Sequence, residues 1–230
     1  MKQLVTTAIV LRRTDYGEAD RILTLLTPDH GKLSLLAKGV RRIKSKLAGG
    51  IELFSVSEIT FIQGRGAVGT LVSTRLLKHY AHIVSDLHRT MLGYKLIEWL
   101  HKATEDEPEA AYFELLHHSF AALDEVNIPI ELIQIWFAAQ LIRLAGHMPN
   151  VQTDGKGQKL VEGQHYAFNF EDMAFSSHPG HGTFGASEIK FLRLLFAGTS
   201  PKALQQITGS TQLQAAISPL IMSLQTRHRV

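Results

Sequence analysis

A short run of cations marks the first third of this 230-residue chain. Residues 38–46 read KGVRRIKSK, in which five of the nine side chains are cationic and none is acidic. Clustered Lys and Arg bind phosphate backbones because each neutralised phosphate releases condensed counterions, whatever the base sequence. Taken alone, the run fits a nucleic-acid-binding loop and a basic loop kept for solubility equally well.

The charge of the chain is divided unevenly. Residues 1–78 hold 13 Lys/Arg against 6 Asp/Glu, whereas residues 79–230 hold 11 against 15. This asymmetry predicts a basic module that binds a polyanion, followed by an acidic module. The candidate phosphate contacts are the cations of the run and others that extend the same patch: Lys38, Arg41, Arg42, Lys44 and Lys46, with Arg12, Arg13, Arg65, Arg75 and Lys78.

Aromatic residues for base stacking are few in the basic module. Phe54 and Phe61 fall in an apolar stretch and are expected in the core, which leaves Tyr16 as the stacking candidate. Binding through phosphate contacts is therefore expected. The acids near Tyr16 (Asp15, Glu18 and Asp20) are expected to be solvated or paired with Arg13 and Arg21.

Histidine is the second residue type that could do chemistry here. His178 and His181 are three residues apart, and His165 is the nearest further ligand. Closed zinc sites present four recognisable ligands, so the pair is expected in a polar turn without metal. A metal-dependent hydrolase built on these three histidines remains an alternative.

Catalytic motifs are absent from the sequence. The chain has no cysteine, which excludes disulfides, thiol catalysis and cysteine-ligated metals. It also lacks the serine nucleophile elbow, the phosphate-binding P-loop and the H-E-x-x-H zinc motif. The glycines around Arg65 lie between two predicted strands, so they indicate a hairpin turn rather than a dinucleotide site. We therefore expect a protein without enzymatic activity and without a cofactor.

The elements that must position the cations are strands. Residues 3–77 alternate in short apolar and polar runs broken by turn residues. A small closed barrel leaves no open edge, and the OB-fold is the commonest barrel of five strands. The predicted strands cover residues 5–11, 21–27, 32–37, 51–63 and 69–77.

Helical spacing follows, beginning with an apolar stripe of Ile83, Leu87, Met91 and Tyr94 that is expected to be buried. The predicted fold is α+β, with an OB-fold at 1–78 and a helical domain at 79–230 that holds an irregular insertion at about 149–186. A hairpin is expected around residues 166–170. The further predicted helices cover residues 108–126, 130–144, 187–196, 200–207 and 211–225.

The sequence also predicts where in the cell the protein is found. No run reaches the ~18 apolar residues that a membrane helix requires. The first residues lack the apolar region of a signal peptide. A cytoplasmic protein that does not bind membranes is therefore expected.

In order and content these features resemble the RecO family of bacterial recombination mediators. The similarity is dense over residues 5–78 and continues over 79–149. It is carried by AIVLR at 8–12, YGEADRIL at 16–23, Thr27, the Gly31 turn, LAKGVRR at 36–42, SKL at 45–47 and the stretch from Trp136 to Pro149.

The resemblance implies a non-enzymatic function in DNA repair and recombination. A family member would bind single- and double-stranded DNA, anneal complementary strands and help to load recombinase onto coated single strands. The implied protein partners are RecR and the acidic C-terminal tail of single-stranded-DNA-binding protein. The implied DNA contacts fall on Lys38, Arg41, Arg42, Lys44 and Lys46, with Arg12 and Arg13 beside them.

The chain departs from the family in its insertion, where many members bind zinc through two C-x-x-C pairs. Thr153-Asp154-Gly155-Lys156 stands at the first pair and His178-Pro179-Gly180-His181 at the second. Thr and Lys are poor zinc ligands. We therefore expect no zinc, and a hairpin held by packing among Phe168, Phe170 and Phe175.

One alternative to DNA binding follows from the chemistry of phosphate recognition. A phosphate-binding patch does not distinguish deoxyribose from ribose. The same residues therefore also fit an RNA-binding OB module joined to a helical protein-interaction domain.

Overall fold

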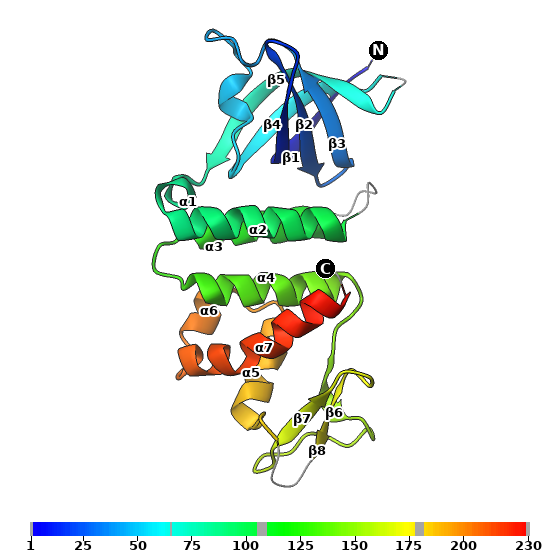
Figure 1. Ribbon diagram of the computed structural model, residues 1–230, viewed down its shortest axis with the longest axis vertical. Helices are drawn as coiled ribbons and strands as arrows, with labels where there is room; N and C mark the ends of the chain where they lie inside the picture. The colour runs from blue at the N-terminus through cyan, green and yellow to red at the C-terminus, as the bar shows by residue number, and fades with distance from the viewer. Residues whose placement is uncertain (1, 65, 105–109, 178–181, 229–230) are drawn as a thin grey trace. The chain divides into compact units, whose positions relative to one another are not determined.

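The computed structural model describes residues 2–64, 66–104, 110–177 and 182–228 (Figure 1). By internal contacts the chain forms two compact units, with unit 1 ending at Val126 and unit 2 beginning at Asn127. The predicted domain boundary between residues 78 and 79 lies inside unit 1. Unit 1 extends beyond the strands because the helices that follow pack back onto them.

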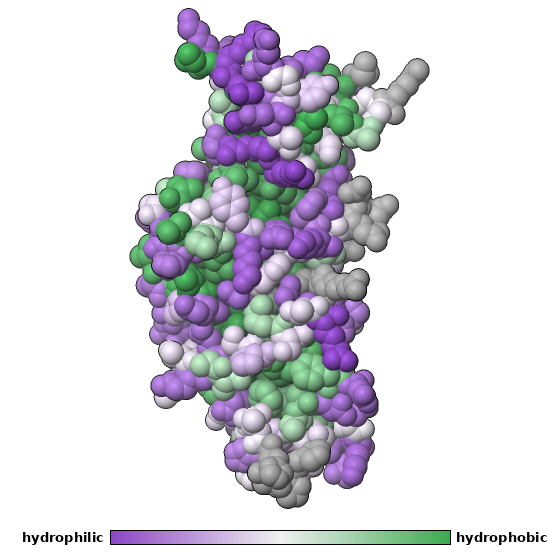
Figure 2. Space-filling model, in the orientation of Figure 1, coloured by the Kyte–Doolittle hydropathy of each residue, from purple (hydrophilic) through white to green (hydrophobic). Residues whose placement is uncertain are grey.

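Unit 1 begins with a closed barrel in the strand order β1-β2-β3-β5-β4, which confirms the predicted OB-fold. The described strands of the barrel pair antiparallel, except that β3 and β5 are parallel at Ser34–Leu36 and Val68–Thr70. The end of the barrel at the top of the view is covered mainly by hydrophilic side chains (Figure 2). The strands are β1 (Gln3–Tyr16), β2 (Asp20–Thr27), β3 (Gly31–Ala37), β4 (Ser55–Ile62) and β5 (Val68–His79).

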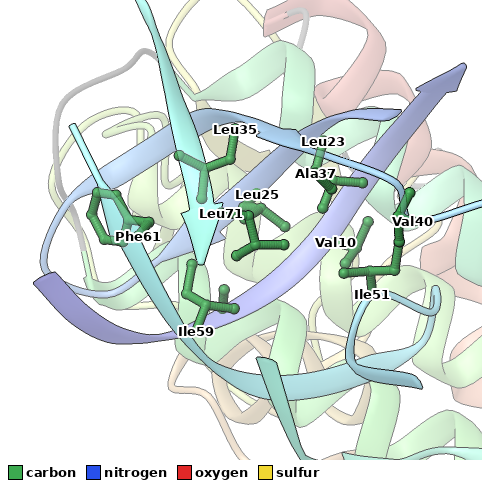
Figure 3. Close-up of a cluster of buried hydrophobic side chains, with 11 residues drawn as sticks. Val10, Leu23, Leu25, Leu35, Ala37, Val40, Ile51, Ile59, Phe61 and Leu71 are labelled. Carbon is green, nitrogen blue, oxygen red and sulfur yellow. The ribbon is translucent and has the colours of Figure 1, made fainter. Parts of the chain in front are cut away.

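The core of the barrel consists of apolar side chains from every strand and from the β3–β4 connection (Figure 3). The connection contributes Val40 and Ile51, which are only 4% and 1% exposed. In Figure 3 both lie toward the same end of the cluster as Val10. Burial of these two residues holds both ends of the segment that carries the cationic run.

A β-bulge at Leu11 determines where the two arginines of β1 point. Val10 pairs with Leu25, but Arg12 pairs with Thr24, so Leu11 is an extra residue in the ladder. Arg13 pairs with Leu23, a residue of the barrel core, and therefore lies on the inward face. Arg12 lies on the outward face.

Helices follow the barrel in the described part of unit 1: α1 (Ala81–Ser85), α2 (Leu87–Ala103) and α3 (Ala110–Asp124). Helix α2 contacts β1 and α3 contacts β2. The ring of Phe54, 1% exposed, meets Tyr94 and Phe120 edge-on at centroid distances of 5.2 and 5.4 Å. Gly93 permits this approach, because a Cβ atom there would lie 2.5 Å from Phe54 Cε1.

Two predictions for this region are wrong. The expected buried stripe holds only for Ile83, since Leu87, Met91 and Tyr94 are 71%, 62% and 50% exposed. Asp86 accepts a hydrogen bond from Arg89 N (2.9 Å) and begins a new helix there, which turns a different apolar face toward the core. Phe54 precedes β4 rather than lying in a strand, with a φ of +57°.

Unit 2 is built around α4 (Ile130–Leu144), which contacts α5 (Ala186–Phe196), α6 (Pro201–Gln205) and α7 (Ser210–His228). Ile135 and Trp136, which lie off the main apolar stripe of α4, are both buried, as expected for a helix packed on several sides. None of the helices in the described ranges is long and apolar enough to cross a membrane.

The insertion forms a second small sheet in the order β6-β8-β7, from strands β6 (Asn150–Asp154), β7 (Tyr166–Asn169) and β8 (Ala174–Ser177). Strands β7 and β8 are antiparallel, which confirms the predicted hairpin. Phe168 meets Phe170 and Phe175 edge-on at 5.1 and 5.2 Å, so the predicted aromatic packing is also confirmed.

Only one of the three histidines considered as metal ligands lies among the described residues. His165 is exposed, as is Lys156 at the place of the family's first ligand pair. His178 and His181 lie outside the described residues. Among the side chains that the structure describes, no group of three or more His, Asp or Glu is placed to hold a metal ion.

Candidate nucleic-acid interface

Residues 38–47, here called the cationic loop, leave β3 beside the turn between β1 and β2. Gly39 N donates to Asp20 Oδ1 (2.6 Å) and Arg41 N donates to Ala19 O (2.9 Å). Gly39 has a φ of +64°, which a residue with a Cβ atom adopts at a cost. The loop is therefore fixed to the turn, and both project from the same end of the barrel (Figure 1).

The other end of the loop is held against β5. Thr74 Oγ1 donates to Leu47 O (3.2 Å) just before the short 3-10 helix η1 (Ala48–Gly50). Gly50 is buried, and a Cβ atom on it would lie 2.4 Å from Thr74 Oγ1. Both ends of the loop are therefore fixed. Hydrogen bonds to the loop backbone hold them, and buried residues lie beside them.

On the inward face of the β1–β2 hairpin, arginines are paired with acids. Arg21 Nε donates to Asp15 Oδ1 (2.8 Å), and Arg41 Nη1 lies 3.6 Å from Asp15 Oδ2. Arg13 Nη1 donates to Glu52 Oε2 (2.7 Å). The hydrogen bond from Arg21, with the charges of Arg41, Arg21 and Arg13, lowers the pKa of Asp15. Asp15 is therefore ionised at neutral pH and offsets part of the charge of Arg41.

Arg75 is also paired and lies apart from the loop. Its Nε and Nη2 atoms donate to the two carboxylate oxygens of Glu58, both at 3.1 Å, and this pairing raises the pKa of Arg75. Because Thr74 faces the cationic loop, its neighbour Arg75 faces the other side of β5. Lys78 lies over the ring of Tyr80 at 5.6 Å.

The remaining predicted cations have their charged groups in solvent. Among the described residues they have no ion-pair or side-chain hydrogen-bond partner, and all are exposed: Arg12, Lys38, Arg42, Lys44 and Lys46. Hydrophilic side chains cover this end of the barrel in Figure 2. A phosphate that binds these cations therefore does not compete with an acidic side chain among the described residues. Arg65, in the β4–β5 connection, lies outside the described residues.

Sequence reasoning missed two residues that shape this surface. Asp20 is the acceptor that fixes the start of the loop, and Glu52 pairs with Arg13 from 39 residues away. Asp20 was expected to be solvated or paired with a nearby arginine, and its contact with Gly39 is 19 residues away in sequence. No local signal connects Glu52 to Arg13, because their contact depends on barrel closure.

The chain matches two family models that together span nearly its whole length. The model described as "Recombination protein O N terminal" matches residues 1–80, and "Recombination protein O C terminal" matches residues 84–228. The boundary between the models lies where β5 ends and α1 begins.

Individual relatives carry the name DNA repair protein RecO. One from Dehalococcoides mccartyi is 35% identical over 163 residues, which is 70% of this chain and 64% of the relative. One from Thermoanaerobacter sp. is 28% identical over 237 residues, covering 99% of this chain and 93% of the relative. The match to the Dehalococcoides proteins thus spans less than two thirds of their length. With both family models matched in order, the chain belongs to the recombination protein O (RecO) family.

Proposed function

We propose that this protein is a DNA repair and recombination mediator that binds DNA through the cationic loop. The observation that carries the proposal is a set of exposed cations beside the β1–β2 turn of an OB barrel, without partners in the part of the chain that the structure describes. OB-folds bind oligonucleotides with this part of the barrel, including the loop between strands 1 and 2. Family membership supports DNA as the polyanion.

The same surface accounts for strand annealing. Cations that neutralise phosphates reduce the repulsion between two backbones. Contacts to the backbone leave the base edges free to pair. The protein therefore binds single- and double-stranded DNA and anneals complementary strands. Membership of the family adds to the proposal that it assists recombinase loading onto coated single strands.

The other parts of the proposal come from the family. The protein acts without catalysis or cofactor, and its partners are RecR and the acidic C-terminal tail of single-stranded-DNA-binding protein. A cytoplasmic location follows from DNA as the ligand and belongs to the same proposal.

The test is fluorescence anisotropy of a labelled single-stranded oligonucleotide across a salt series, with an annealing assay in the same solution. We expect binding that weakens steeply with salt and annealing that is faster than without protein. Competition with RNA of the same sequence distinguishes a DNA-binding protein from an RNA-binding one. A preference for RNA would favour the alternative of an RNA-binding module. Absence of binding at low salt would overturn the proposal.

Substitution of Asp15 by asparagine should strengthen DNA binding. Asp15 is the acid nearest to Arg41 (3.6 Å), so removal of its charge leaves Arg41 available to a phosphate. One additional phosphate contact steepens the salt dependence for single strands by about 0.7. Anisotropy of Asp15→Asn and of Glu98→Gln, an acid on α2 paired with Lys102, would check this. Unchanged or weaker binding by Asp15→Asn would show that Arg41 makes no phosphate contact.

A further inference from the structure

We propose that Tyr16 and Ile43 contact unstacked bases, so that the surface around the cationic loop binds single strands in preference to duplexes. This inference rests on the proposed function and specifies the form of DNA that the surface prefers. It departs from the expectation that phosphate contacts alone account for binding. Its basis is the position of two exposed apolar side chains among unpaired cations.

Ile43 lies in the middle of the cationic loop and is fully exposed. Its neighbours Arg42 and Lys44 are both exposed and unpaired among the described residues. Isolated exposed apolar residues are common on protein surfaces. Here, however, the cations on both sides of Ile43 would hold a phosphate backbone next to it. The bases attached to that backbone have apolar faces, which the isoleucine side chain can contact.

Tyr16 ends β1 and is 55% exposed. Its cross-strand partner is Asp20, whose carboxylate accepts the hydrogen bond from Gly39 N. Directly opposed residues have Cβ atoms about 5 Å apart. A Cβ atom on Gly39 would lie 3.7 Å from Arg42 Cδ, so the Arg42 side chain folds over the start of the loop. Tyr16 and Arg42 are therefore next to the two residues that the hydrogen bond from Gly39 to Asp20 joins.

Another exposed cation, with no partner in the described ranges, lies on β1 before the tyrosine. Beyond the bulge, Arg12 and Tyr16 are on the same face of β1, because alternate residues of a strand share a face. Along β1, Tyr16 thus lies between Arg12 and the turn to which the cationic loop is hydrogen-bonded. A strand whose phosphates contact both cations carries its bases over the ring of Tyr16.

Only single strands can use these apolar contacts. Stacking on an aromatic side chain requires a base whose face is free, and it is tolerant of sequence because every base has such a face. In a duplex the faces are covered by neighbouring base pairs, so a duplex meets this surface through phosphates alone.

The test compares three ligands of about 16 nucleotides, near the upper site size of one OB-fold. They are oligothymidylate, an abasic strand with the same phosphates, and a duplex. Wild-type protein is expected to bind oligothymidylate more tightly than the abasic strand. Tyr16→Ala should weaken oligothymidylate binding by about tenfold, as expected for the loss of one base–aromatic stack. Ile43→Ser should weaken it as well, and both variants should leave abasic binding, duplex binding and the salt dependence unchanged. Tyr16→Phe keeps the ring and should bind as wild type does.

The outcomes separate this inference from the proposed function. If wild type binds the abasic strand as tightly as oligothymidylate, or if the variants weaken all three ligands alike, base contact at Tyr16 and Ile43 is overturned while DNA binding stands. If wild type binds none of the ligands in a salt-dependent way, the proposed function itself fails. Both side chains are exposed, so the variants should keep the thermal unfolding transition of wild type.

Discussion

Replacement of Arg42, Lys44 and Lys46 together by alanine is expected to weaken single-stranded DNA binding about a hundredfold at about 0.1 M salt. Each of these cations is exposed and has no acidic partner among the described residues. Loss of a single-strand phosphate contact lowers the salt dependence by about 0.7, so three lost contacts lower it by about 2. The loss should be similar for every DNA sequence, because phosphates carry no sequence information.

The control removes the same charge elsewhere. Lys102, Lys156 and Lys159 are exposed cations outside the barrel, and their joint replacement by alanine changes the net charge equally. We expect this control to shift affinity only slightly and to leave the salt dependence unchanged. Equal effects of the two triple variants would mean that net charge rather than the cationic loop governs binding. Both variants should unfold as wild type does, because all six side chains are exposed.

The second large effect is expected on stability. Phe54→Ala should lower the free energy of unfolding of unit 1 by about 3–5 kcal/mol. The ring is buried and meets Tyr94 of α2 and Phe120 of α3 edge-on, so its loss leaves a cavity where both helices meet the barrel. The substitution does not relieve backbone strain at position 54, because alanine disfavours a positive φ as phenylalanine does. The lost packing is therefore not offset.

The measurement uses the two tryptophans of the chain. Trp99 lies on α2 in unit 1 and Trp136 on α4 in unit 2. In a Trp136→Phe background, urea unfolding followed by fluorescence reports on unit 1. Met91→Ala on the same helix is the control, because its side chain is exposed and a change within about 0.5 kcal/mol is expected. A loss for Phe54→Ala no greater than that of the control would contradict the packing described.

The barrel was largely predictable because its signals are local. Alternating runs and turns such as 28–31 located the strands to within a few residues. The full length of β1 was not predictable, since Gln3–Tyr16 pairs with β4 in its first part and with β2 in its second. Such a bend depends on the bulge at Leu11 and on which strands are neighbours.

Long-range packing also explains the errors in the helices. The stripe of Leu87, Met91 and Tyr94 has the spacing of a buried face, but the break at Asp86 turns α2 so that Leu92, Leu96 and Leu100 face the core. Spacing alone identifies an apolar face. It does not identify which of two competing faces meets the rest of the protein.

For the candidate site, the sequence identified the cations but not their pairing. The predicted contact between Asp15 and Arg21 is local and is present, whereas Arg13 pairs with Glu52 instead of a nearby acid. The Arg75–Glu58 pair depends on the β4–β5 register. The division into paired and unpaired cations therefore required the fold, and the DNA contacts themselves stay predictions.

The buried anchors of the cationic loop have a consequence for how this protein can evolve. Val40 and Ile51 belong to the barrel core, whereas the intervening residues 41–46 are mostly exposed. Substitutions in that tip leave the core intact, so selection can alter ligand preference there without loss of foldability. The barrel thus acts as a frame whose stability does not depend on the side chains at this tip.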